Sequence, residues 1–375
     1  MLRRREHGTP GNWALPHATA HGRPFSSQPG SSGNALYTHE RGEGKDRKLT
    51  LSRPGAWSHH MAAAFMFPGQ GSQAVGMGQA LAENFAPARA VFNEVDAALG
   101  EKLTAVMWEG PAEKLTLTEN AQPALMAVSL AVLRVLQTEA GLDLARDVQC
   151  VAGHSLGEYS ALAAAGALSI SDTATLLRIR GRAMQEAVPV GEGAMAALLG
   201  LSFEQAREVA AEARDGQVCD AANDNGAAQV VISGDTSAVD RAIELAKKRG
   251  AKRAVKLPVS APFHSALMRP AAEVMAHALS QVALNKPAVP VISNVTAAAT
   301  TDPGKILEAL IAQVTGTVRW RESISAMAHA GVTAFYELGA GKVLCGLAKR
   351  IAADAECFAI GTPEEVRAFK LPARS

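Results

Sequence analysis

The 375-residue sequence predicts an α/β fold, in which a mostly parallel sheet carries helices on both faces. Three observations lead to this prediction. Apolar stretches typical of buried strands alternate with helical stretches after residue 60. Residues 189–259 follow the order β-α-β-β-α-β, which indicates a small ferredoxin-like unit inserted into a larger region. A serine flanked by glycines separates a predicted strand from a predicted helix at residues 153–157.

These patterns divide the chain into three parts: an extension at 1–60, a catalytic region formed by 61–188 and 260–375, and the insert at 189–259. The extension holds six of the ten His, nine Lys or Arg against four Asp or Glu, and no periodic apolar pattern. We predict that it is disordered and that the folded part begins at Met61, with a transit peptide as the alternative.

The elements follow from the spacing of the apolar residues. The apolar run 62–67 is typical of a buried strand, and the Gly-rich stretch Pro68–Gln73 predicts the turn that ends it. A helix is expected at 121–139, because its apolar residues recur every three or four positions. Strands are also expected at 148–152, 194–199, 218–223, 229–233, 254–257, 289–293 and 333–338, and helices at 77–84, 86–98, 158–167, 172–188, 202–214, 237–249, 269–282, 303–314 and 321–330.

Composition excludes several classes of function. The formal net charge is +1, which favours neither nucleic acid nor an anionic membrane as a partner. No uninterrupted apolar run has the length needed to span a bilayer. The four Cys form no C-x-x-C pair, so neither a zinc site nor a disulfide framework is indicated, and we expect a cytoplasmic protein.

The stretch Gly153-His154-Ser155-Leu156-Gly157 matches the G-x-S-x-G pattern of a nucleophile elbow. The sharp turn between strand and helix would lift the Ser155 hydroxyl above the sheet edge, and the free N–H groups of the following helix would stabilise an oxyanion. The alternative is a glycine turn that holds a helix-capping serine. We interpret Ser155 as a nucleophile.

Such a serine needs a general base. Beyond the extension there are four His. His154 adjoins the nucleophile and should project differently, whereas His277 and His329 lie in predicted helices. His264 lies in a proline-stiffened loop at 258–265, where a general base is expected. No Asp or Glu stands out as a third member, so a backbone carbonyl is the candidate for fixing the His264 tautomer.

Arg180 lies on the apolar face of the predicted helix 172–188, whereas Arg178 and Arg182 fall elsewhere. A buried guanidinium normally pairs with an anion and binds a carboxylate with two parallel hydrogen bonds. A structural ion pair, or a side chain that reaches solvent, is the alternative. Because Ser155 is the predicted nucleophile, we favour a carboxylate of the substrate as the partner of Arg180. An acyl group with a free carboxylate is of the malonyl type.

These residues together resemble the malonyl-CoA:acyl-carrier-protein transacylase family, over residues 61 to about 361. The motifs that carry the resemblance are Phe67-Pro68-Gly69-Gln70-Gly71-Ser72-Gln73, Gln122-Pro123-Ala124-Leu125, Gly153-His154-Ser155-Leu156-Gly157-Glu158, Arg180-Gly181, His264-Ser265-Ala266-Leu267-Met268 and Glu337-Leu338-Gly339. The resemblance implies an α/β-hydrolase-like domain with a ferredoxin-like insert. It also implies transfer of malonyl from malonyl-CoA to acyl carrier protein through a malonyl-serine intermediate, in fatty-acid synthesis.

By position, the resemblance assigns a role to each site residue. Ser155 would be acylated, with His264 as its base and the main-chain carbonyl of Gln313 as the acceptor that holds the ring. The N–H groups of Gln70 and Leu156 would form the oxyanion hole. The residues expected to contact substrate are Arg180 at the malonyl carboxylate, Gln122 in the pocket lining, and Phe263, whose bulk favours unbranched malonyl.

The resemblance implies no metal and no redox cofactor, since the coenzyme A thioester is a substrate. We expect a monomer that binds malonyl-CoA and acyl carrier protein. The alternatives are a serine thioesterase or esterase, an acyltransferase of a polyketide pathway, and a non-catalytic acyl-group sensor or carrier-binding module.

Overall fold

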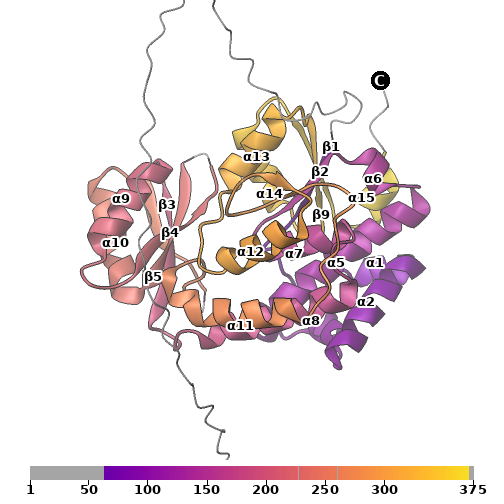
Figure 1. Cartoon of the computed structure of the whole chain (residues 1–375), viewed down its shortest axis with the longest axis horizontal. Helices are drawn as coiled ribbons and strands as arrows, with labels where there is room; N and C mark the ends of the chain where they lie inside the picture. Colours follow the sequence, from indigo (N-terminus) through magenta and orange to yellow (C-terminus); the bar gives the residue numbers. More distant parts are fainter. Residues whose placement is uncertain (1–62, 227, 260, 371–375) are drawn as a thin grey trace, which may run out of the picture. The chain divides into compact units, whose positions relative to one another are not determined.

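The computed structural model describes residues 63–226, 228–259 and 261–370, which form two β-sheets with helices around them (Figure 1). The predicted extension at 1–60 lies outside the described residues. Both sheets belong to one compact unit, so the domain boundaries at 188/189 and 259/260 remain a prediction.

The large sheet has six strands in the order β10-β9-β1-β2-β7-β8. All neighbours are parallel except β7 and β8, which are antiparallel. Its strands are β1 (Ala63–Phe67), β2 (Cys150–Gly153), β7 (Val291–Ile292), β8 (Ala299–Thr300), β9 (Ala334–Leu338) and β10 (Glu356–Ile360). The carboxyl ends of the central strands β1 and β2 lie side by side, so the turns that follow them meet at one edge.

Alternate residues of β1 enter two different cores. Phe65 and Phe67 pack among the helices on one face, and Met66 packs on the other face against α13 and α14. The helices of this region are α1 (Gln79–Asn84), α2 (Ala86–Leu99), α3 (Leu103–Glu109), α4 (Ala112–Thr116), α5 (Thr118–Glu139), α6 (Leu144–Asp147), α7 (Leu156–Ala164), α8 (Ile170–Glu186), α11 (Arg269–Ser280), α12 (Pro303–Gln313), α13 (Trp320–His329), α14 (Val343–Ile351) and α15 (Pro363–Ala368). The predicted parallel sheet covered on both faces is therefore confirmed.

One helix in the described part of the chain, α5, is long and apolar enough to cross a membrane. Its most apolar window is 83% buried inside the protein. Burial of this kind is what a central core helix requires, and α5 packs against both α2 and α8.

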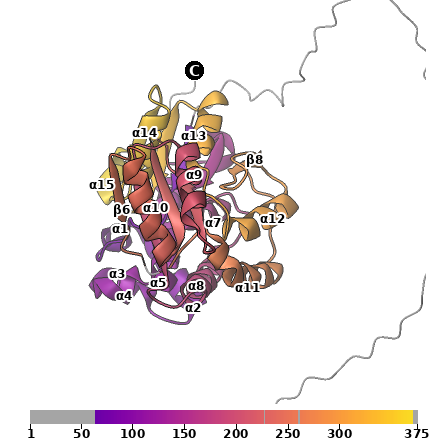
Figure 2. The ribbon, with the colours of Figure 1, turned by 90° about the vertical axis from the view of Figure 1, so that its left-hand side faces the viewer.

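The small sheet is antiparallel, with the strand order β4-β5-β3-β6. Its elements follow the predicted β-α-β-β-α-β order: β3 (Gly193–Leu199), α9 (Phe203–Ala213), β4 (Cys219–Asp224), β5 (Gln229–Asp235), α10 (Thr236–Lys248) and β6 (Arg253–Lys256). Helices α9 and α10 lie side by side against it (Figure 2). This arrangement confirms the ferredoxin-like unit.

Every strand and helix predicted from the sequence has a counterpart, with some differences in length. The strand predicted at 289–293 is reduced to Val291–Ile292, since Pro290 has no N–H to donate to the sheet. Helix α7 begins at Leu156, two residues earlier than predicted, directly after the serine. The elements α3, α4, α6, β8, α14, β10 and α15 were not predicted.

Candidate active site

Ser155 occupies a strained turn between β2 and α7. Its φ of 55° and ψ of −110° are unusual for a residue with a side chain. The two glycines of the motif make this turn sterically feasible. A Cβ on Gly153 would lie 1.8 Å from the carbonyl oxygen of Gly157, and a Cβ on Gly157 would lie 2.2 Å from that of Phe67. The predicted elbow is therefore present, and both glycines are needed where backbones approach closely.

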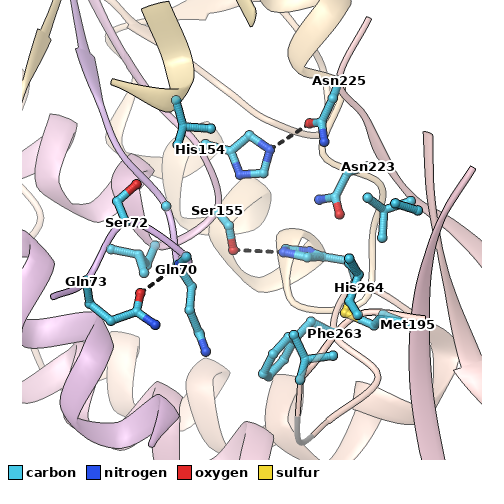
Figure 3. Close-up of a pocket in the computed structure, with 18 of the residues that line it drawn as sticks. Gln70, Ser72, Gln73, His154, Ser155, Met195, Asn223, Asn225, Phe263 and His264 are labelled. Atoms are coloured by element: carbon cyan, nitrogen blue, oxygen red, sulfur yellow. Dashed lines mark hydrogen bonds between the residues drawn. The ribbon is translucent and has the colours of Figure 1, made fainter. Parts of the chain in front are cut away.

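His264 lies beside Ser155, with 2.8 Å between Nε2 of the ring and the serine Oγ (Figure 3). On the other side of the ring, Nδ1 lies 2.9 Å from the carbonyl oxygen of Gln313 and 3.1 Å from that of Gly316. Two carbonyl acceptors require a proton on Nδ1, which leaves Nε2 of the neutral ring free to accept the serine proton. Burial, and to a smaller extent the nearby Arg180, lower the pKa of His264 to about 3, so the neutral base is favoured.

Arg180 is 1% exposed and reaches the serine from α8. One guanidinium nitrogen donates to the Gln122 side-chain oxygen at 2.8 Å. The other lies 2.8 Å from the side-chain oxygen of Gln313 and 3.1 Å from Ser155 Oγ. Within the described ranges no carboxylate forms an ion pair with Arg180, and burial lowers the pKa of its guanidinium. A buried cation without an anionic partner is energetically unfavourable, so Arg180 should bind an anionic group that enters the site.

The neighbouring arginines behave differently. Arg178 points away from the site, as predicted, but it too is buried, and it pairs with Glu101 and hydrogen-bonds Asn120. Arg182 is exposed and pairs with Glu119. Arg180 is thus the member of this trio that is directed at Ser155.

A cavity of about 490 Å³ opens over the serine. Gln70 lies in the turn after β1, and Leu156 is the first residue of α7, where a backbone N–H has no acceptor within the helix. Both line the cavity beside Ser155. Phe263 and Gln122 line it as well, so the structure brings all the predicted site residues together around one space.

The small sheet forms the opposite wall of the cavity. Met195 and Ala197 of β3, Val231 of β5, and Asn223 at the end of β4 face the serine across it. His154 turns away from Ser155, as predicted, and its Nε2 lies 3.0 Å from the Asn225 side-chain oxygen. Figure 3 shows this pair on one side of the Ser155–His264 contact, with Phe263 and Met195 on the other.

Three groups in the site were missed by sequence reasoning. Gly316 supplies the second carbonyl to His264. Asn294 accepts from the Ser155 N–H at 2.7 Å and donates to the Gly153 carbonyl at 2.7 Å, which fixes both sides of the elbow. Glu158 is buried three residues after the nucleophile. Its place in the motif, on a helix with an otherwise apolar face, was the one available signal.

The other two histidines lie away from the cavity, and the site shows no metal-binding cluster among the described residues. His277 and His329 lie in helices α11 and α13, as predicted, and both are exposed. Within residues 63–370, leaving aside 227 and 260, no group of three His, Cys, Asp or Glu side chains is placed to hold a metal ion.

Comparisons with known proteins agree with this geometry. Residues 64–355 match the acyl transferase domain family. The malonyl CoA-acyl carrier protein transacylase of Bacillus subtilis is 48% identical over 304 residues, covering 81% of this chain and 94% of that protein, and its Escherichia coli K12 counterpart is 46% identical, covering 81% and 97%. Solved structures agree as well. The crystal structure of an acyl-carrier-protein S-malonyltransferase from Bartonella henselae is 57% identical, with a TM-score of 0.80 over 82% of this chain and 98% of that chain. A malonyl-transacylase solved in complex with its type II polyketide acyl-carrier protein is 40% identical, with a TM-score of 0.79 over 82% of this chain and 98% of that chain. With the family profile covering most of the chain and these relatives covering four-fifths of it, the chain belongs to the acyltransferase family that includes the malonyl CoA-acyl carrier protein transacylases.

Proposed function

We propose that the protein transfers malonyl from malonyl-CoA to the phosphopantetheine thiol of acyl carrier protein, supplying fatty-acid synthesis, through malonyl-Ser155. The observation that carries the proposal is the buried Arg180, which lacks a carboxylate partner and lies 3.1 Å from Ser155 Oγ. The names of the relatives support the overall reaction. The covalent intermediate is our inference from the site.

In the first half-reaction, Nε2 of His264 accepts the Ser155 proton while Oγ bonds to the thioester carbonyl carbon. The N–H groups of Gln70 and Leu156 donate to the resulting oxyanion. Collapse of the tetrahedral intermediate breaks the carbon–sulfur bond, and coenzyme A leaves as a thiol with the proton from His264. Malonyl-Ser155 remains.

In the second half-reaction, the phosphopantetheine thiol of the carrier gives its proton to His264 and its sulfur attacks the malonyl ester. The same N–H groups stabilise the second oxyanion. Ser155 Oγ then leaves and recovers the proton, which restores the enzyme. The carbonyls of Gln313 and Gly316 hold the imidazole in one tautomer throughout.

Arg180 selects the acyl group in this scheme. A malonyl carboxylate accepts from the guanidinium, whereas an acetyl group leaves the buried charge without an anion. Phe263 narrows the pocket beside the base and favours malonyl over branched analogues, although one methyl group is worth only about 1–3 kcal/mol in such a pocket.

The decisive measurement is the intact mass of the protein after incubation with malonyl-CoA, acetyl-CoA and methylmalonyl-CoA. We expect a malonyl adduct on the wild-type protein and none on Ser155→Ala. Detection of the adduct on the alanine variant would place the acyl group elsewhere and refute the assignment of Ser155.

A hydrolase would share the elbow and the base, but it would release free malonate. Measuring malonate against malonyl-carrier product therefore separates the two activities, and we expect the carrier product to dominate. Supplying a fatty-acid carrier and a polyketide carrier in competition tests the pathway, for which we expect preference for the fatty-acid carrier.

We further propose that the protein acts as a monomer in the cytoplasm and without a metal or redox cofactor. Cys150, Cys219 and Cys345 are buried free thiols, which suits a reducing compartment. The proposed steps use only the groups named above, so treatment with a chelator should leave the transfer rate unchanged. Sedimentation at assay concentration tests the monomer.

A further inference from the structure

Glu158 is a buried carboxyl group that the proposed mechanism does not use. It lies in the first turn of α7 and is 2% exposed. Burial raises its pKa to about 7, while donors from Gln313 and Asn294 and the charge of Arg180 act to lower it. A carboxyl group kept in such a place calls for an explanation, since burial of a charge is costly unless it is well paired.

The principal partner of Glu158 is the side chain of Gln313. Glu158 Oε2 accepts from Gln313 Nε2 at 2.7 Å. The same amide nitrogen also donates to the Ser155 carbonyl at 3.0 Å. The oxygen of that amide faces Arg180 at 2.8 Å. A continuous chain of hydrogen bonds therefore runs from the carboxylate through one amide to the guanidinium.

The carboxylate reinforces the orientation of this amide. An ionised carboxylate only accepts hydrogen bonds, so it requires the NH₂ end of Gln313, and the oxygen end is left to face the guanidinium. If the amide were rotated by half a turn, its NH₂ would face the guanidinium of Arg180. Both groups are hydrogen-bond donors, so this arrangement is unfavourable. The Ser155 carbonyl and the guanidinium favour the same orientation, and Glu158 adds the one charged acceptor, at the shortest distance to the amide nitrogen.

A second arm of the network supports the elbow. Glu158 Oε2 accepts from the main-chain N–H of Asn294 at 3.1 Å. The side chain of Asn294 in turn holds the Ser155 N–H and the Gly153 carbonyl. Glu158 thus reaches both the serine turn and Arg180 without touching the reacting atoms.

We propose that Glu158 is a positioning residue that sets acyl selectivity, because it orients the Gln313 amide so that Arg180 is held ready for the substrate carboxylate. The inference rests on the proposed role of Arg180. It assigns to Glu158 the organising task that an acid beside His264 performs in other serine enzymes, although here the acid acts on the substrate clamp.

The test compares kcat/KM for malonyl and acetyl transfer to carrier protein at pH 8, where Glu158 is ionised. For Glu158→Ala we expect malonyl transfer to fall about 100-fold and acetyl transfer less than about tenfold, so that selectivity falls at least about tenfold. Glu158→Gln keeps an oxygen acceptor and should lose less selectivity than the alanine variant. Ser160→Ala is the matched control in the same helix, since its buried hydroxyl has no partner among the described residues, and it should keep wild-type selectivity.

Gln313→Met extends the test, because it removes the bridging amide and keeps the carbonyl that faces His264. It should lose selectivity as Glu158→Ala does, and it decides the matter if Glu158→Ala fails to fold by circular dichroism. Equal losses for malonyl and acetyl in these variants would overturn the inference. A wild-type enzyme without preference for malonyl would instead contradict the proposed role of Arg180, so the two failures are distinguishable.

Discussion

The large and small sheets contribute differently to the same cavity. The large region supplies Ser155, Arg180 and Glu158, which are polar groups held by networks of short hydrogen bonds. The small sheet has a core of aliphatic residues and one cysteine. To the cavity it presents the apolar Met195, Ala197 and Val231 together with the side-chain amides of Asn223 and Gln229. The reacting groups thus depend on the turn after β2 and its surroundings, whereas the small sheet mainly shapes the space they face.

The largest expected effect lies in the large region. Arg180→Ala should reduce malonyl transfer by about 10²–10³-fold, because loss of a buried charge partner costs about 2–5 kcal/mol. Acetyl transfer should change much less. The measurement is kcat/KM for both acyl groups. Arg178→Ala is the matched control on the same helix, and it should lower the free energy of unfolding by about 1–2 kcal/mol with unchanged selectivity. Equal losses for both acyl groups in Arg180→Ala would refute the clamp.

Two asparagines sharpen the comparison between the regions. Asn294→Ala leaves the Ser155 N–H and the Gly153 carbonyl without partners, so we expect transfer to fall about 100-fold and the free energy of unfolding to fall by about 2–3 kcal/mol. Asn225→Ala removes only the partner of His154 and should reduce transfer less than about tenfold. Denaturant unfolding and transfer kinetics measure both quantities. A larger loss in Asn225→Ala would show that the small sheet does more than shape the cavity.

The acid limb of the pH profile tests the burial of His264. With its pKa lowered to about 3, the imidazole should remain a neutral base well below the ordinary pKa of about 6.5. We expect the rate at which Ser155 reacts with a neutral sulfonyl fluoride to show no inflection near pH 6.5 in Glu158→Gln, a variant that removes the nearby carboxyl group whose pKa burial raises to about 7. The unfolded chain binds this proton near pH 6.5 and the folded chain near pH 3, so His264 also lowers the stability of the protein as the pH falls between these values. An inflection at 6.5 would mean that the ring is hydrated in the working enzyme.

The smallest effects are expected at the apolar walls. Phe263→Ala and Met195→Ala each enlarge the cavity from one side, beside the base and on β3 respectively. Each should change the ratio of methylmalonyl to malonyl transfer by about tenfold or less, since a methyl group is worth about 1–3 kcal/mol. Phe263→Ala should have the larger effect, because Phe263 directly precedes the base. The reverse order would make β3 the principal determinant of acyl size.

The parts predicted from sequence are those whose signal is local. The elbow at Ser155 depends on two neighbouring glycines, the insert on short alternating runs, and Arg180 on its place in an apolar helix face. The carbonyl of Gly316 carries no side-chain signal, and Asn294 lies far along the chain from the turn that it holds. The Gln313 carbonyl was expected only through the family resemblance. Glu158 stood inside the motif, but its importance depends on a partner 155 residues away.

Ser155 and His264 both adopt positive φ angles, 55° and 57°, although neither is glycine. Such conformations cost about 1–3 kcal/mol each, and here they lie at the two ends of one 2.8 Å contact. A laboratory selection for thermal stability alone would therefore accept glycine at either position and would yield a more stable but inactive protein. Efforts to engineer more robust variants should screen for turnover at every round and seek their gains away from this pair.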